Sequence, residues 1–146
     1  MSKGLALTIG LNSVNPLKYL YVDLKDLDAC EADAKDMAAL ASSQGFEVTT
    51  LLTSQATLAK VTNEIRKAAS SLTAVDIFLL TFSGHGEQIN DTNSDELYDH
   101  KDETWCLYDG QLVDDEINKL FAEFPQGCRI LMFSDSCHSG TVARIR

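Results

Sequence analysis

The sequence lacks the features that mark membrane and secreted proteins. None of its apolar runs approaches the roughly 18 consecutive residues that a membrane-spanning helix requires. The first residues, MSKGLALTIGL, lack the separate charged, apolar and cleavage regions of a secretory signal peptide, and their apolar run is typical of a strand. We therefore expect one globular domain of 146 residues, located in the cytoplasm and without a membrane partner.

The sequence also lacks the cysteine spacing of a structural zinc site. No C-x-x-C pair is present, and no Cys/His grouping has the spacing of structural zinc. Two disulfides are the alternative for an even count, but the lack of a secretion signal argues against them. We expect reduced thiols at the four positions, Cys30, Cys106, Cys128 and Cys137.

Positive charge is in short supply, with 12 Lys and Arg against 22 Asp and Glu. Half of the acidic residues lie between Glu87 and Glu116, where Lys101 is the only Lys or Arg. A nucleic-acid partner is therefore not expected, since phosphate binding requires Lys and Arg. The acidic block has three open interpretations: a solvated loop, a cation site, or a surface that attracts basic substrates.

The apolar pattern predicts alternating strands and helices. Nearly unbroken apolar runs, two of them typical of central strands covered on both faces, predict strands at 4–11, 46–52, 75–82 and 128–135. Stripes at helical spacing predict helices at 30–41, 58–72 (with Thr53 or Ser54 as cap) and 114–124. Residues 84–103 predict a long polar loop, followed by a short strand at 104–108. The fold class is therefore α/β with a mainly parallel sheet.

Two chemically reactive segments follow the two central strands. FSGHGEQ contains His85, and SDSCHSG contains Cys137. Ligands bind at the carboxyl ends of parallel strands, so neighbouring strands would bring these residues together. A histidine can take the proton of a thiol and produce the nucleophilic thiolate, while the N–H groups of Gly86 and Cys137 can bind an oxyanion. The alternative is a buried structural cysteine and a loop histidine. His138 and His100 are not expected to be catalytic.

These segments resemble those of caspase-like cysteine peptidases. SGHG and DSCHSG place His85 52 residues before Cys137, similar to the spacing in caspases. DSCHSG differs from the caspase motif Gln-Ala-Cys-x-Gly and is closer to metacaspases and orthocaspases. The resemblance implies a caspase-like three-layer sandwich, with residues 1–146 as the large (p20-type) catalytic subunit. It also implies a thioester intermediate and a partner, the small (p10-type) subunit.

A third segment implies the substrate class. DACEADAKDM resembles the metacaspase pattern Gly-Cys-x-x-Asp-Ala, with Cys30 and Asp33 at matching positions. In that family this aspartate and the one two residues before the nucleophile, here Asp135, line the S1 pocket and select Arg or Lys. Carboxylates suit such a role because they pair with guanidinium or ammonium groups. The alternatives are a solvated helix residue for Asp33, a structural turn carboxylate for Asp135 and a buried helix residue for Cys30.

The resemblance also raises calcium as a possible cofactor. Asp102, Asp114 and Asp115 match positions where metacaspases bind Ca²⁺ through oxygen ligands. The fourth family aspartate corresponds to Arg144, whose positive charge would oppose the ion. Asp114 and Asp115 also fit the acidic first turn of a helix. We therefore expect no metal or other cofactor to be required.

The final Arg-Ile-Arg suggests how the chain is processed. An enzyme that cleaves after basic residues would produce such an end by cutting itself after Arg146 or at Arg144. A truncated chain is the alternative. The expected function is a cysteine endopeptidase acting on polypeptides with basic residues. The rival functions are a catalytically silent caspase-like binding module and an α/β signalling or thiol-redox domain.

Overall fold

The structure is a computed structural model of the chain. It describes residues 2–20, 24–90, 101–136 and 140–145, with the backbone alone for 87–90, 101–103 and 140–145. Within these ranges, none of the helices combines the length and the apolar character that a bilayer crossing requires.

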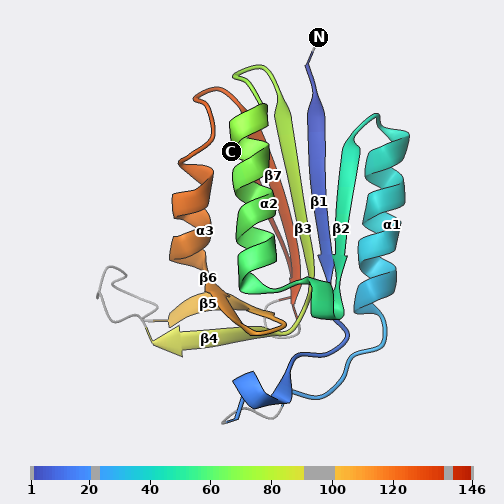
Figure 1. Cartoon of the computed structure of the whole chain (residues 1–146), viewed down its shortest axis with the longest axis vertical. Helices are drawn as coiled ribbons and strands as arrows, with labels where there is room; N and C mark the ends of the chain where they lie inside the picture. Colours follow the sequence, from blue (N-terminus) through green and yellow to red (C-terminus); the bar gives the residue numbers. More distant parts are fainter. Residues whose placement is uncertain (1, 21–23, 91–100, 137–139, 146) are drawn as a thin grey trace.

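A mainly parallel sheet organises the fold (Figure 1). Its strands lie in the order β2-β1-β3-β7-β8. The first four are parallel and confirm the four predicted strands, whereas β8 pairs antiparallel with β7 and was not predicted. Their bounds are β1 Gly4–Gly10, β2 Glu47–Leu52, β3 Ile77–Gly84, β7 Arg129–Ser136 and β8 Gly140–Ile145.

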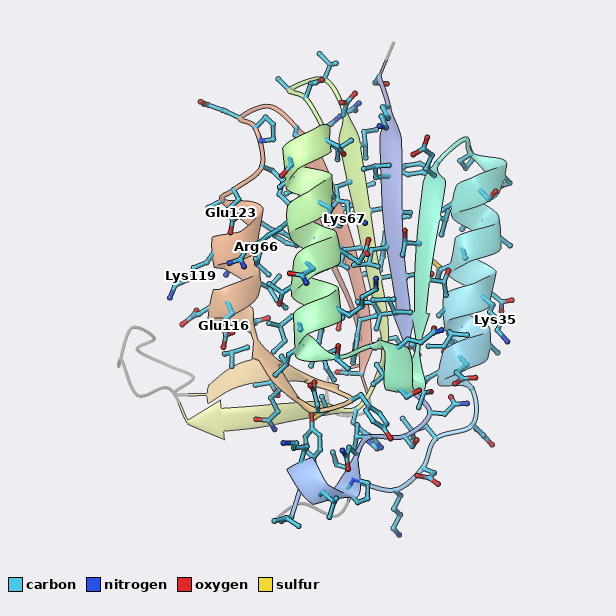
Figure 2. The ribbon with its side chains drawn as sticks, in the orientation of Figure 1. Lys35, Arg66, Lys67, Glu116, Lys119 and Glu123 are labelled. Atoms are coloured by element: carbon cyan, nitrogen blue, oxygen red, sulfur yellow. The ribbon has the colours of Figure 1, made fainter. Side chains whose placement is uncertain are left out.

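Helices cover both faces of this sheet and confirm the predicted three-layer α/β architecture. α2 (Leu58–Ser71) and α3 (Asp114–Phe121) lie together on one face, in front of the sheet in Figure 1, and α1 (Cys30–Ser43) lies on the other. Arg66 of α2 and Glu123, just beyond α3, form an exposed ion pair of 3.4 Å (Figure 2). Such exposed pairs contribute little to stability, so burial of apolar side chains accounts for most of the packing.

The two faces of the sheet are unequally filled because successive strand residues alternate between them. On the face of α2 and α3, a large core includes Leu7, Phe78 and Leu80. On the face of α1, the buried cluster is small and contains Ala6, Ala41 and Leu79. The α1 face therefore leaves room for a cavity.

A second, antiparallel sheet lies beyond the carboxyl ends of the main strands (Figure 1). It consists of β4 (Gly86–Asn90), β5 (Lys101–Leu107) and β6 (Gly110–Val113), in that order. The prediction of one loop over 84–103 is therefore wrong where β4 and the start of β5 form. These polar segments lack an apolar alternation, and pairing between distant backbones determines their conformation.

Trp105 joins the two sheets. Its indole stacks on Phe82 of β3, with ring centroids 4.6 Å apart and planes 5° from parallel. Its Nε1–H donates to Ser134 Oγ of β7 over 2.9 Å. One side chain from the small sheet is thus bound to both central strands of the main sheet.

The cap of α2 also differs from the prediction. Thr57 Oγ1 accepts a hydrogen bond from the N–H of Lys60 over 3.1 Å, so Thr57 is the N-cap. Thr53 and Ser54 belong instead to a short 3₁₀ turn, η2 (Thr53–Gln55). Several hydroxyl residues precede this helix, and only the backbone path selects which of them caps it.

Candidate active site

The end of β1 holds the first turn of α1 in place. The side-chain Oδ1 of Asn12 accepts hydrogen bonds from the N–H groups of Cys30 (3.0 Å) and Glu31 (3.1 Å), which would otherwise lack helical partners. A Cβ added at Gly10 would lie 2.2 Å from the carbonyl oxygen of Cys30. Only glycine permits this approach. The start of α1, and with it Asp33, therefore lies directly over the end of β1.

The segments that carry His85 and Cys137 end side by side. β3 and β7 are neighbours, with Ser83 paired to Asp135 and Gly84 paired to Ser136. A Cβ at Gly86 would lie 2.6 Å from Ser136 Oγ. Both glycines that flank the histidine thus lie against the residue that precedes the cysteine.

Three of the residues considered for the catalytic dyad fall outside the described part of the chain. These are the predicted nucleophile and the two histidines that were not expected to be catalytic, namely Cys137, His138 and His100.

A backbone carbonyl orients the imidazole of His85. His85 Nε2 lies 2.5 Å from the carbonyl oxygen of Lys25. A carbonyl only accepts hydrogen bonds, so in the neutral ring the proton is on Nε2 and Nδ1 keeps its lone pair. The histidine's own carbonyl accepts from the N–H of Cys106 over 3.0 Å. Lys25 was not predicted, because a carbonyl that acts through the backbone leaves no sequence signal.

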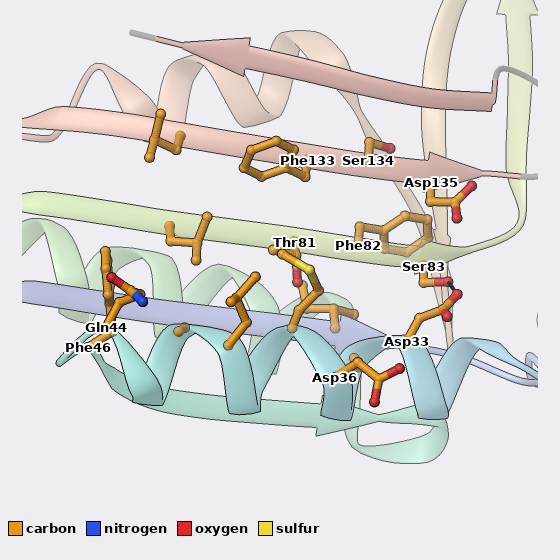
Figure 3. Close-up of a pocket in the computed structure, with 17 residues that line it drawn as sticks. Asp33, Asp36, Gln44, Phe46, Thr81, Phe82, Ser83, Phe133, Ser134 and Asp135 are labelled. Carbon is orange, nitrogen blue, oxygen red and sulfur yellow. Dashed lines mark hydrogen bonds between the residues drawn. The ribbon is translucent and has the colours of Figure 1, made fainter.

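Two of the predicted S1 residues meet in one cavity (Figure 3). Asp33 Oδ2 accepts a 2.9 Å hydrogen bond from Ser83 Oγ, and the partner of Ser83 on the adjacent strand is Asp135. Asp33, Ser83 and Asp135 all line a cavity of about 560 Å³. Ser83 was not assigned a role from the sequence, although it stands two residues before His85 and so belongs to the same strand end.

The remainder of that cavity is apolar and runs between α1 and the sheet. Phe133 of β7 and Leu40 of α1 are 37% and 57% exposed. The walls are completed by Met37, Leu79 and Leu131. The cavity therefore has a carboxylate-rich end near the carboxyl ends of β3 and β7 and an apolar body, which suits a side chain with an aliphatic stem and a cationic head.

Cys30 occupies a different position from its predicted partners. It is buried at the start of α1, and it is not among the described residues that line the cavity. Its backbone N–H is the group bound by Asn12. Its backbone carbonyl oxygen lies against Gly10 of β1.

The calcium positions are spread over separate elements. Asp114 and Asp115 form the first turn of α3, as expected for acidic residues near a helix N-terminus. The backbone of Asp102 pairs with Ile89 in the small sheet, and that of Arg144 pairs with Met132 at the edge of the main sheet. Among the described side chains, no group of three or more His, Cys, Asp or Glu residues is arranged to hold a metal ion. Arg146 lies outside the described residues.

Comparison with known proteins agrees with this geometry. Residues 5–146 match the family model of the metacaspase, peptidase C14 domain. Metacaspase-3 of Arabidopsis thaliana is 37% identical over 131 residues, which cover 80% of this chain and 36% of that protein. Metacaspase-1A of Neurospora crassa is 38% identical over 152 residues, which cover 94% of this chain and 32% of that protein.

A solved structure is similar along almost the whole chain. Protein GSU0716 from Geobacter sulfurreducens shares 56% sequence identity and superposes with a TM-score of 0.84, covering 94% of this chain and 52% of that one. The chain spans about a third of the length of the two metacaspases described above. Since the family model covers nearly all of its residues, the chain belongs to the metacaspase family, as a peptidase C14 domain.

Proposed function

We propose that this domain is the catalytic part of a cysteine endopeptidase that hydrolyses peptide bonds after Arg or Lys. The observation that carries the proposal is the contact between Gly86 and Ser136, which are the neighbours of His85 and Cys137. Because these neighbours lie against each other, it supports the assignment of His85 and Cys137 as a catalytic dyad. Asp33 and Asp135, which line one cavity, lie near the same strand ends.

The reaction follows from the chemistry of these groups. His85 takes the thiol proton of Cys137 through Nδ1, and the thiolate attacks the carbonyl carbon of the scissile bond. The N–H groups of Gly86 and Cys137 stabilise the oxyanion. The intermediate collapses to a thioester as His85 protonates the leaving amine. A water molecule, deprotonated by His85, then hydrolyses the thioester and regenerates the thiol.

The bond from His85 to the carbonyl of Lys25 supports this assignment. It keeps the proton on Nε2 and directs the basic nitrogen away from Lys25. Backbone orientation removes the need for a third side chain. The same bond stabilises the imidazolium that forms when the thiol is deprotonated, because a carbonyl oxygen accepts more strongly from a charged donor.

Asp33 and Asp135 are proposed to bind the basic side chain of the substrate, with Ser83 orienting Asp33. Burial of a guanidinium or ammonium against these carboxylates makes them a specificity pair, and loss of one partner of such a pair costs about 2–5 kcal/mol. Cys30, which the resemblance also assigned to this pocket, is proposed to act only by supporting the helix that carries Asp33. The proposal includes no metal or other cofactor.

The remaining expectations concern the complete protein. We propose that a small subunit supplies the rest of the substrate-binding surface, because the relatives extend well beyond the matched region. Self-cleavage after Arg146 or at Arg144 would separate the two parts. The proposed location is the cytoplasm.

A substrate panel tests the proposal. The complete protein containing this domain is assayed with matched fluorogenic peptides that end in Arg, Lys, citrulline or Asp. We expect turnover of the Arg and Lys peptides alone, since citrulline retains the shape of arginine without its charge. Cys137→Ala and His85→Ala should each abolish turnover while the melting temperature remains near that of the parent protein.

Two results would contradict the proposal. Equal turnover of Arg and citrulline peptides would remove the role of Asp33 and Asp135. Failure of the correctly folded protein to cleave any peptide would favour the catalytically silent binding module. Self-processing is tested separately: Cys137→Ala protein that is still cut at Arg146 would show that another protease makes the cut.

A further inference from the structure

Thr81 presents a buried hydroxyl that the fold does not use. The residue is 4% exposed, and among the described residues its Oγ1 is a buried side-chain oxygen with no hydrogen-bond partner. Buried polar groups are nearly always paired, because leaving one unpaired costs free energy. An orphaned hydroxyl in the middle of the sheet therefore calls for a partner from outside the fold.

The neighbouring threonine shows that this strand environment can satisfy a hydroxyl. Thr8 of β1 lies in register with Thr81 of β3, and it is also buried. Its Oγ1 is 2.9 Å from Oγ1 of Thr50 on β2, so the two hydroxyls satisfy each other. On the other side of Thr81, the residue in register is Phe133, which offers no side-chain hydrogen-bonding group.

Thr81 is one of the residues that line the cavity containing the carboxylates. Thr81 and Ser83 are two residues apart on β3, so both side chains project from the face toward α1 (Figure 3). The strand rise of about 3.3 Å per residue puts Thr81 roughly 7 Å along β3 from Ser83, to which the Asp33 carboxylate is bound. Thr81 and the Asp33 carboxylate thus lie at two levels along the strand.

A cation that contacts both levels must span that distance. A single nitrogen with two hydrogen bonds of about 2.9 Å joins acceptors no more than about 6 Å apart, which is the limit for a lysine ammonium. A guanidinium carries five N–H donors on three nitrogens around a plane, so its opposite edges reach further. It can donate to the carboxylates from one edge and still have an N–H directed at Thr81.

We propose that Thr81 is a specificity residue that selects arginine over lysine, its Oγ1 accepting a hydrogen bond from the substrate guanidinium. The inference rests on the proposed function, since it requires that Asp33 and Asp135 bind a basic side chain. It adds a third contact to that site, and it supplies the hydrogen-bond partner that the buried Thr81 hydroxyl lacks within the described fold.

The test compares Arg and Lys peptides with the complete protein and its Thr81→Val variant. Valine keeps the branched shape and removes only the hydroxyl. We expect kcat/KM for the Arg peptide to fall about tenfold, as for the loss of one hydrogen bond to a charged group, with the Lys peptide changed less than about twofold. Thr81→Ser should retain the Arg preference. The matched control is Thr8→Val, which should leave the Arg to Lys ratio unchanged because Thr8 does not line the cavity.

A binding measurement keeps this inference separate from the proposed function. Calorimetry with the Cys137→Ala protein, which needs no turnover, should show agmatine binding more tightly than cadaverine, and Thr81→Val should remove that difference.

An unchanged Arg to Lys ratio in Thr81→Val, in an enzyme that cleaves Arg peptides, would overturn the role of Thr81 alone. Absence of all cleavage together with selective agmatine binding would overturn the peptidase proposal and leave Thr81 supported. Absence of agmatine binding would overturn the role of Thr81. Thr81→Ala is the second variant if Thr81→Val does not fold.

Discussion

The bond between Trp105 and Ser134 offers a direct test of how the two sheets are held together. Trp105→Phe retains a ring to stack on Phe82 but removes the Nε1–H that donates to Ser134 Oγ over 2.9 Å. Ser134 is only 6% exposed, so its hydroxyl would be left in a nearly dry site. Loss of the donor and of part of the ring should lower the free energy of unfolding by about 1–3 kcal/mol.

A double-mutant cycle isolates the hydrogen bond from the packing. Trp105→Phe, Ser134→Ala and the double variant are unfolded in urea, and the coupling between the two sites should be about 1 kcal/mol. Gly86 pairs with Trp105, so a loosened small sheet should also shift the segment containing His85. We therefore expect kcat to fall more than KM rises. A coupling energy near zero would refute the reasoning, because the indole would then contribute only its packing.

Two further predictions concern the catalytic edge and the opposite end of the sheet. Gly86→Ala should lower kcat roughly 10–100-fold with an intact fold, because the added Cβ would lie 2.6 Å from Ser136 Oγ and displace the segments of the dyad. Full activity of this variant would show that the two segments need not touch. At the other end, the backbone N–H groups of Lys3 and Thr73 donate to the Asp76 carboxylate and hold its pKa below the usual value. The stability from these bonds is present above the unfolded-state pKa near 4 and is lost as the pH falls through the lower folded-state pKa. Asp76→Asn should therefore flatten the acid limb of a plot of unfolding free energy against pH, and an unchanged acid limb would contradict this.

The strands and helices of the main layers could be predicted because their signals are local. A nearly unbroken apolar run marks β3, which is buried on both faces, and apolar side chains recur with the period of a helix in α2. In the small sheet only the apolar part of β5 was predicted, as a strand at 104–108. β4 and the start of β5 are polar, and the backbone pairing of Gly86 with Trp105 joins positions that share no sequence pattern.

The candidate site likewise contains residues that could be predicted from the sequence and residues that could not. Asp33, His85 and Asp135 were identified from motifs, because their chemistry depends on the type of side chain. Lys25 was not identified, because it acts through a carbonyl that every residue possesses. Ser83 and the buried Thr81 depend on which face of β3 meets α1, and that is decided only when the layers pack.

The sequence by itself determined the α/β class, the order of the main elements and the residue types that the chemistry needs, since periodicity and motifs are properties of nearby residues. The tertiary structure decided which of those residues meet. Strand register placed Ser83 beside Asp135, and close packing placed Gly86 against Ser136. Both depend on contacts between residues about 50 positions apart, and no local pattern encodes such distances.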